Sequence, residues 1–382
     1  MWWLHLYFTS GHVARVTDAE NPHEVRFILV CLLPARLSDP GCVKNLRPLQ
    51  VGLCTREVVS CYGRLPRLSV GDNKVLPSCP PETWGCRMSR HTPPRPVAVA
   101  ELFPELVSLR REAVRLHPRP GKPTCWESSV GGPLLWPGDE LWPECAEEHF
   151  DLDGTPYGVM PLVPVAQVYQ AGAPSVPYAP GCDLLQVLWC PFNHYDCECP
   201  RPWVYWRDSD SVGQVADTPP APPEAPENYV PSPCVVHPER VTEYPRWDMP
   251  GDLYHDLEKR FTRLHDDTGW SYGSDLSDAP GTKLGGYPGW TQPPDWPDCE
   301  SCGQRMEHLL TVASWECDSA TWRTWLPVED RELLKGQEEV QTKLNLSVTQ
   351  AAGLMLGDAG GVYIFECLSC PGRPTSHRFD CS

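Results

Sequence analysis

The chain has 382 residues, of which 41% are hydrophobic and 45 are prolines. That length allows one large domain or two of ordinary size, each with a buried core. Proline has a fixed φ and no amide hydrogen, so this content disfavours long helices and central strands. No apolar run reaches the roughly 18 residues of a bilayer-spanning helix, so none is predicted.

The net charge of −18 is distributed unevenly along the chain. Residues 1–87 carry 10 of the 32 Lys and Arg residues and 7 of the 50 Asp and Glu residues, so the acidic excess lies in residues 88–382. An acidic body is repelled by phosphate backbones and by anionic lipid. We therefore expect neither nucleic acid nor a membrane as a partner, and instead a protein or a small polar ligand.

The segment 1–87 differs from the rest of the chain in charge and in its scattered single cysteines. It is either a poorly ordered N-terminal extension or an over-extended start that precedes the true first residue, Met88. Its opening, MWWLHLYF, lacks the basic region of a secretion signal. In a chain of this size, paired cysteines without such a signal are typical of metal binding in a reducing compartment. These features predict a cytoplasmic protein.

Elements of both kinds are predicted along residues 88–382. An apolar stripe with three- and four-residue steps predicts a helix over about 99–116, with its start limited by Pro104. Further helices are expected around 253–264 and after Pro327, and a solvated proline-rich loop over 211–233. Short segments rich in β-formers predict strands at 161–169, 183–189, 203–206, 307–315 and 361–366.

Four landmarks recur in the same order in two parts of the chain. The first landmark is a Gly-Gly turn, and the second, ten residues after the second glycine, is the motif Trp-Pro-(Asp/Glu)-Cys. The third is a predicted strand that begins near a methionine, and the fourth is a predicted strand that ends at a cysteine. The paired segments are 128–137 and 281–290, 142–145 and 296–299, Met160 onward and Met306 onward, and 184–190 and 362–367. This order predicts two homologous halves, about 99–210 and 233–382, joined by the loop 211–233. The alternative is convergent use of turn residues.

The second half contains two Cys-x2-Cys pairs, Cys299/Cys302 and Cys367/Cys370, each next to a predicted strand. Two residues between thiols allow both sulfurs to bind one ion at about 2.3 Å. We therefore predict a closed, four-thiolate structural zinc site. A redox dithiol or ordinary buried thiols are the alternatives.

The first half has Cys-x3-His pairs in the corresponding places: Cys145/His149 and Cys190/His194. If the halves share a fold, these four residues converge as a second zinc site of the Cys2His2 type. Cys197 and Cys199 follow closely and are competing ligands. A site with four protein ligands leaves no position for water, so both zinc ions are expected to support folding rather than catalysis.

The sequence contains none of the common nucleophile, phosphate-binding or metalloprotease motifs. The carboxylates Asp358, Asp380, Glu316 and Asp318 lie near predicted strand ends or turns, where solvated acidic residues are common. The tryptophans at 136, 142, 290 and 296 occupy matching places in the two halves. They either line a shared cleft or, as large aromatic residues usually do, pack in the core.

Short motifs in residues 99–382 resemble those of the YwqG-like family, bacterial proteins built on a domain of unknown function, and the actinobacterial members are most similar. The matching residues are Gly131-Gly132-Pro133, Ala166-Gln167, Leu184-Leu185-Gln186, Leu284-Gly285-Gly286-Tyr287-Pro288 and Gly357-Asp358. The resemblance implies a cytoplasmic α+β protein with antiparallel sheet. It implies no catalytic residue and no metal ligand, so the zinc sites are argued from this sequence alone.

Together these patterns predict an α+β fold with a duplicated, mostly antiparallel sheet, a few helices and two zinc knuckle sites. The leading functional hypothesis is a zinc-stabilised module that binds a ligand or a protein. One alternative is a hydrolase that uses carboxylates in a groove between the halves. Another is a structural component of a protein assembly.

Overall fold

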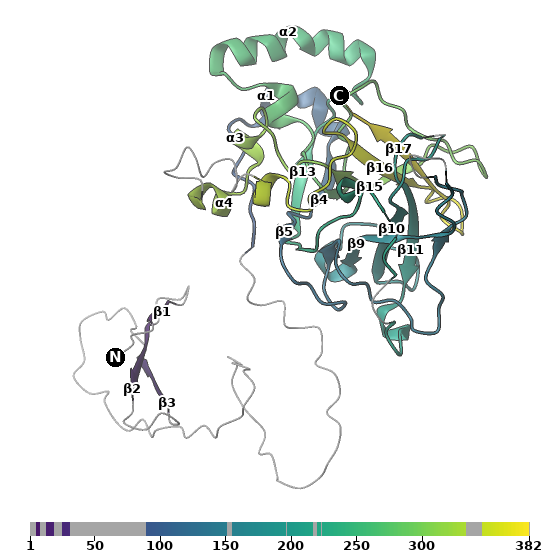
Figure 1. Cartoon of the computed structure of the whole chain (residues 1–382). Coiled ribbons are helices and arrows are strands. Elements are labelled where there is room, and N and C mark those ends of the chain that lie inside the picture. Colours follow the sequence, from purple (N-terminus) through teal and green to yellow (C-terminus); the bar gives the residue numbers. More distant parts are fainter. Residues whose placement is uncertain are drawn as a thin grey trace. The chain divides into compact units, whose positions relative to one another are not determined.

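The computed structural model describes residues 89–381, apart from 151–154, 196, 217–219, 223 and 334–345, together with three strands near the N-terminus (Figure 1). The chain divides into two compact units, residues 1–76 and 77–382. In the first unit, β1 (His5–Tyr7), β2 (Val13–Asp18) and β3 (Val25–Val30) form an antiparallel sheet. The rest of the predicted extension, residues 1–87, lies outside the described residues.

Two six-stranded sheets form the centre of the second unit, and the pairs within them are antiparallel. The first sheet has the order β11-β10-β9-β6-β12-β5. Its strands are β5 (Arg119–Pro120), β6 (Ser129–Val130), β9 (Val163–Tyr169), β10 (Leu184–Cys190), β11 (Arg201–Arg207) and β12 (Cys234–Val235). Beside it, β7 (Glu144–Cys145) pairs with β8 (Met160–Pro161).

The second sheet has the order β13-β4-β14-β15-β16-β17. Its strands are β4 (Arg111–Arg115), β13 (Glu239–Glu243), β14 (Lys283–Gly285), β15 (Glu307–Ala313), β16 (Gly361–Glu366) and β17 (Thr375–Asp380). The predicted α+β class with mostly antiparallel sheet is therefore confirmed, and each of the five predicted strands is present.

Helical segments lie mainly at one end of the second unit. They are α1 (Val99–Leu102), the 3₁₀ helix η1 (Pro104–Leu109), α2 (Gly251–Thr268), the π-helical turn η5 (Tyr272–Leu276), α3 (Trp322–Trp325) and α4 (Val328–Leu333), with short 3₁₀ turns η2 (Gln170–Gly172), η3 (Ser209–Ser211) and η4 (Glu227–Tyr229). Figure 1 shows α2 above the sheets with α1 beside it. Leu257 and Leu264 of α2 pack on Phe103 and Leu106. No helix among the described residues combines the length and apolar content required to cross a bilayer.

The predicted single helix over 99–116 is wrong. The helix ends at Leu102, a 3₁₀ turn begins at Pro104, and residues 111–115 form β4. Pro104 has no amide hydrogen, and β4 pairs with β13 on one side and β14 on the other. Two ladders of backbone hydrogen bonds therefore override the helical spacing of the apolar residues, because tertiary context outweighs intrinsic helix propensity.

The two sheets match residue by residue in their central strands. Gln167 of β9 is opposite Gln186 of β10, and Thr311 of β15 is opposite Tyr363 of β16. Both ladders shift register at the same point, so that Val165 in β9 and Leu309 in β15 are each left out of the pairing. Such a β-bulge sets the twist and bend of a strand. The central strands of the two sheets therefore share the same local shape.

This register corrects the sequence comparison in one place. The matching of Met160 with Met306 is shifted by two residues, because the backbone N–H of Leu162 donates to Pro143 and that of Met306 donates to Pro297. Leu162 is therefore the counterpart of Met306. Met160 and Leu162 are both buried, so the hydrophobic pattern alone did not fix the register.

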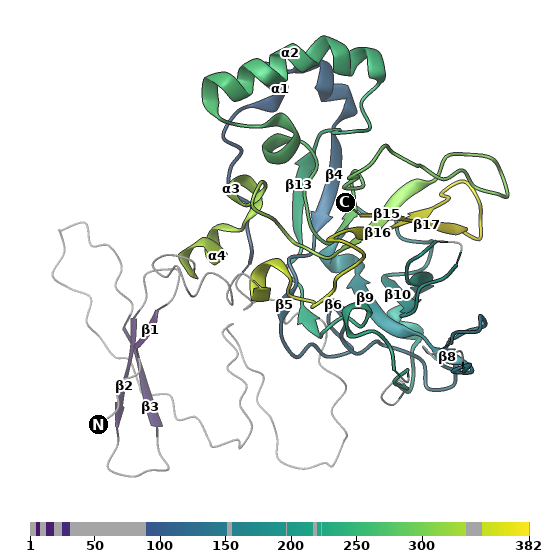
Figure 2. The same ribbon diagram turned by 45° about the horizontal axis from the view of Figure 1, so that its top comes forward.

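The first strands of the two halves are exchanged between the sheets. Along the chain, β4 is followed by β5 and β12 is followed by β13. In the sheets, however, β4 lies between β13 and β14, and β12 lies between β5 and β6. Figure 2 shows β4 and β13 running side by side from the helical end toward β5 and β6. Each sheet thus contains a strand from the other half, which ties the halves together by backbone hydrogen bonds.

Alternating side chains divide the molecule into layers. On β16, Val362 and Ile364 enter a large buried cluster shared by both sheets, whereas Tyr363 and Phe365 enter a separate small cluster. On β10, Val187 enters the shared cluster, and Leu188 enters a second small cluster. Because side chains alternate between the two faces of a strand, each small cluster covers the face of its sheet opposite the main core.

Candidate metal centres

The second sheet ends at a group of four thiols: Cys299, Cys302, Cys367 and Cys370, which are the predicted residues. Their sulfurs all lie within 4.8 Å of one another, with Cys299 and Cys370 3.9 Å apart and Cys302 and Cys367 3.6 Å apart. Thiolates at about 2.3 Å from one tetrahedral zinc are about 3.8 Å apart. These residues are free cysteines, so the group could hold a metal ion without rearranging a disulfide.

The turn that carries the first thiol pair is closed by backbone hydrogen bonds. Gly303 donates to the carbonyl of Cys299, and Cys299 donates to Gln304. Gly303 has a φ of 68°, a conformation that favours glycine. Burial alone would raise the pKa of the Cys299 thiol, but backbone N–H groups at Cys302 and Ser301 donate to its sulfur and lower its pKa to about 7. The turn therefore favours the thiolate form of Cys299, and the thiolate is the form that binds metals.

The first sheet ends at the second predicted group: Cys145, His149, Cys190 and His194. The Cys145 sulfur lies 3.4 Å from Nε2 of His194, and the Cys190 sulfur lies 3.2 Å from Nε2 of His149. A thiolate and an imidazole on one tetrahedral zinc are about 3.6 Å apart. All four side chains are buried. This burial raises the pKa of Cys190 and lowers that of His149, so it favours the neutral form of each group.

A backbone carbonyl orients one of these imidazoles. Nδ1 of His194 lies 3.2 Å from the carbonyl oxygen of Cys199, and the His194 backbone N–H donates to the same oxygen. When Nδ1–H donates there, Nε2 presents its lone pair to the thiols. Such a second hydrogen bond is usual for histidines that bind metals, because it fixes the tautomer and the ring orientation.

The four tryptophans predicted to be equivalent pack around the two metal-ligand groups. Trp136 is 1% exposed and Trp290 is 3% exposed, and each contacts its neighbour, with ring centroids 5.2 Å apart for Trp136 and Trp142 and 6.4 Å apart for Trp290 and Trp296. Trp136 shares a buried cluster with Cys145 and Cys190, and Trp290 shares one with Cys299 and Cys367. These aromatic residues therefore form the small outer cores rather than an open cleft.

The two cysteines considered as competing ligands belong to a third group. Cys197 and Cys199 lie with His377 of β17, and their ligand atoms are within 4.8 Å of one another. Sequence reasoning missed His377, because β17 was not among the predicted strands. The six residues of β17 carry only one large apolar side chain, Phe379, so no alternating pattern distinguishes this strand from a loop.

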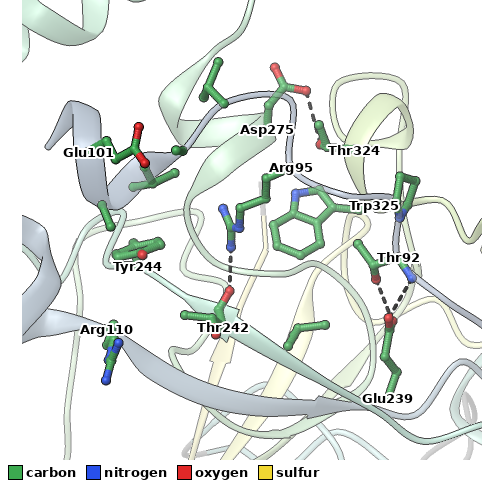
Figure 3. Close-up of a pocket in the computed structure, with 16 residues that line it drawn as sticks. Thr92, Arg95, Glu101, Arg110, Glu239, Thr242, Tyr244, Asp275, Thr324 and Trp325 are labelled. Carbon is green, nitrogen blue, oxygen red and sulfur yellow. Dashed lines mark hydrogen bonds between the residues drawn. The ribbon is translucent and has the colours of Figure 1, made fainter.

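A cavity of about 590 Å³ lies over β13, the edge strand of the second sheet (Figure 3). Tyr244 and Trp325 contribute aromatic surface to it. Arg95, in the segment that precedes α1, donates a hydrogen bond to the backbone carbonyl of Thr242. Arg95 lies in the stretch before the first helix, to which the sequence analysis assigned no site residue. An arginine between prolines was the one local signal for a structural role there.

Glu239 is a carboxylate of this cavity with several hydrogen-bond partners. Burial opposes its ionisation, but hydrogen bonds from His117 and Thr92 outweigh that effect and lower its pKa. The Glu239 side chain accepts from the backbone N–H of Thr92 at 2.7 Å and from its hydroxyl at 2.6 Å. The group is therefore held as a carboxylate, whereas a general acid needs a raised pKa.

Two of the acidic residues considered for catalysis, Asp380 and Glu316, accept hydrogen bonds from neighbouring parts of the chain. Asp380 accepts from the backbone N–H and the hydroxyl of Thr291, both at 2.6 Å. Glu316 is buried and accepts from the backbone N–H of Thr282 at 3.1 Å, and burial raises its pKa. These carboxylates fix loops against the second sheet.

Comparison with known proteins leaves the family of the chain open. No protein-family model matches the sequence, and none of the curated proteins compared with it is detectably similar. The resemblance to the YwqG-like family therefore stays a prediction from the short motifs quoted above, and the geometry of the sites carries the functional argument.

Proposed function

We propose that this protein is a zinc-stabilised binding module made of two homologous halves, each held by its own structural zinc site. The observation that carries the proposal is the equivalence of the two ligand groups. Cys190 and Cys367 occupy matching positions, at the end of β10 and directly after β16, and Cys145 and Cys299 follow matching Trp-Pro turns. Zinc is favoured among divalent metals because it takes four thiolate and imidazole ligands in tetrahedral geometry.

A structural role for the metals follows from the ligand count. Four protein ligands saturate a tetrahedral zinc and leave no position for a substrate. Each group also closes a small aromatic cluster on the face of its sheet opposite the main core. Small hydrophobic clusters contribute little stability by themselves, and a metal site is one of the usual ways to reinforce them.

We assign ligand binding to the cavity over β13. Its volume lies within the roughly 300–1,000 Å³ of small-molecule sites. The lining combines the aromatic rings of Tyr244 and Trp325 with charged side chains of both signs, Arg95, Arg110 and Glu239, which suits a small polar ligand. The resemblance to YwqG-like proteins and a cytoplasmic location are part of the same proposal.

Replacement of one ligand in each half tests the structural zinc sites. Cys190→Ala and Cys367→Ala should each lower the zinc content of the purified chain by about one ion, and the double variant should lower it by about two. Cys182→Ala is the matched control, because Cys182 is a half-buried free thiol outside the three groups. Unchanged zinc content in Cys190→Ala and Cys367→Ala would refute the assignment.

Ligand binding is tested separately from the metals. A thermal-shift screen of small polar metabolites should find a compound that stabilises the wild-type chain, because a ligand that binds only the folded state raises its stability. Val241→Trp, at a lining position on the same face of β13 as Glu239, should fill the cavity and abolish that shift without changing the zinc content. A shift of the same size in Val241→Trp would place the ligand elsewhere.

A further inference from the structure

The loop that follows β10 is longer than its counterpart in the second half. Cys190 is paired with Arg201, and the backbone N–H of Cys367 donates to Pro374, so the equivalent loops are 191–200 and 368–373. The first loop therefore has ten residues where the second has six. Cys197 and Cys199 both lie in this longer loop, near its end. Neither is needed for the four-ligand group formed by Cys145, His149, Cys190 and His194.

The longer loop places its two thiols beside the other sheet. The third ligand of their group, His377, lies on β17, where it is opposite Ile364 of β16. β17 and β11 are edge strands of different sheets, and they lie in contact. The guanidinium of Arg373 stacks 4.7 Å from the ring of Trp206 at the same junction. This group of ligands therefore draws one imidazole and two thiols from different halves.

From this arrangement we infer a third metal site, in which Cys197, Cys199 and His377 bind a zinc-class ion and leave one coordination position open. Their ligand atoms lie within 4.8 Å of one another, which is close enough for one ion after small side-chain adjustments. Two thiolates and one imidazole are a ligand set that zinc uses in sites with a fourth, exchangeable ligand. The fourth ligand here is water, a small anion or a thiol.

Burial distinguishes this site from the two closed ones. Cys199 is fully buried, whereas Cys197 and His377 are half-buried. All four ligands of the Cys2His2 group are buried. Solvent and small solutes can therefore approach the third site from the side of Cys197, whereas Nε2 of His377 is itself buried. An ion there would join the two sheets and still exchange its outer ligand.

The backbone of Cys199 limits the choice of variants. Its side chain is fully buried in the shared core and its carbonyl accepts from the backbone N–H and Nδ1 of His194, so a substitution that shifts the Cys199 backbone would also disturb the Cys2His2 group. Cys197 and His377 lie at the more exposed side of the third site. They are the positions at which the third site can be removed while the closed sites are retained.

Cobalt reports directly on an open coordination position. The full-length chain, stripped of metal under reducing conditions, is titrated with Co²⁺, whose visible bands depend on ligand number. The wild type should bind about three ions, and excess azide should shift the bands of only one of them, because the closed sites have no free position. His377→Ala and Cys197→Ser should each bind about two ions and lose the azide shift.

Two controls complete the experiment. His255→Ala removes an exposed imidazole from α2 and should behave as the wild type. The sulfur-to-cobalt bands of the closed sites, measured with two equivalents of Co²⁺, show whether each variant is folded. His377→Asn is used in place of a variant that is not folded. Binding of only two ions by the wild type would overturn the inference. So would an azide shift of undiminished size in His377→Asn or Cys197→Ser.

Discussion

Val165 and Leu309 occupy the same structural position in the two halves. Each is the single residue that the ladder between the two central strands omits, and each is buried in the core shared by both sheets. A bulge at matching points is a specific feature of a backbone, whereas a Gly-Gly turn or a Trp-Pro step recurs in unrelated loops. This relationship is the strongest structural support for our proposal that the halves are homologous.

Removal of metal should destabilise the chain. An ion held at 100 times its Kd contributes about 2.7 kcal/mol to the free energy of unfolding, so two closed sites contribute about 5 kcal/mol. Dialysis against a strong chelator under reducing conditions should lower the thermal midpoint, and added zinc should restore it. Identical unfolding curves with and without chelator would contradict the proposed role of the metals.

Lys283→Met should be strongly destabilising. Nζ of Lys283 lies 2.7 Å from Oε1 of Glu243, and both side chains are buried. Removal of one partner leaves the other as an uncompensated buried charge, at a cost of about 3–5 kcal/mol. Chemical denaturation measures the change. The double variant Lys283→Met/Glu243→Gln should recover part of the loss, and a loss below about 1 kcal/mol in Lys283→Met would contradict the expectation.

Gly286→Ala should be more destabilising than Gly303→Ala. Both glycines have a positive φ, 69° and 68°, for which a side chain costs about 1–2 kcal/mol. At Gly286 an added Cβ would also lie 2.3 Å from Oε2 of Glu243, whereas at Gly303 it would meet nothing within 4 Å. That clash adds about 1–3 kcal/mol. Equal losses of unfolding free energy in the two variants would show that the turn yields to the added methyl group.

Acid should destabilise the folded chain partly through His117. Burial, followed by the charge of Arg115, lowers the pKa of His117 from 6.5 to about 3, so the folded state holds this imidazole neutral. Its contribution is fully present above pH 6.5, and it is lost as pH falls toward 3, because the unfolded chain binds the proton first. At pH 5 the loss amounts to about 2 kcal/mol.

His117→Asn is the variant that isolates this effect. His117 has a φ of 45°, a conformation that Asn tolerates. The free energy of unfolding of His117→Asn should fall less steeply between about pH 6.5 and pH 5 than that of the wild type. Parallel pH profiles for the two proteins would mean that His117 does not contribute to acid unfolding.

The sequence predicts the parts of this molecule whose signals are local. Cys-x2-Cys spacing and the matching Cys-x3-His pairs identified both groups of four ligands, and five strands rich in β-formers were found. Residues 111–115 were missed because their strand forms only when β13 and β14 supply partners on both sides. His377 was missed for a related reason, since its strand is an edge strand whose pairing with β16 depends on the fold.

Registers and exchanges between elements depend on contacts that no local pattern encodes. The two-residue shift at Met306 follows from backbone hydrogen bonds to the Trp-Pro turns, not from hydrophobicity. The exchange of β4 and β12 between the sheets likewise joins residues that are far apart in the chain. The cavity combines residues from several separate segments, and only the folded chain brings Arg95 and Glu239 to the same cavity.

X-ray absorption at the zinc edge, with a zinc count on the same sample, tests the central claim most directly. Protein purified under reducing conditions and dialysed against a weak chelator should retain about two tightly held zinc ions per chain. Their mean environment should be about three sulfur ligands at roughly 2.3 Å and about one nitrogen ligand at roughly 2.0–2.1 Å, the average of a four-thiolate site and a site with two thiolates and two imidazoles. Less than one zinc per chain, or an environment dominated by oxygen, would contradict the account.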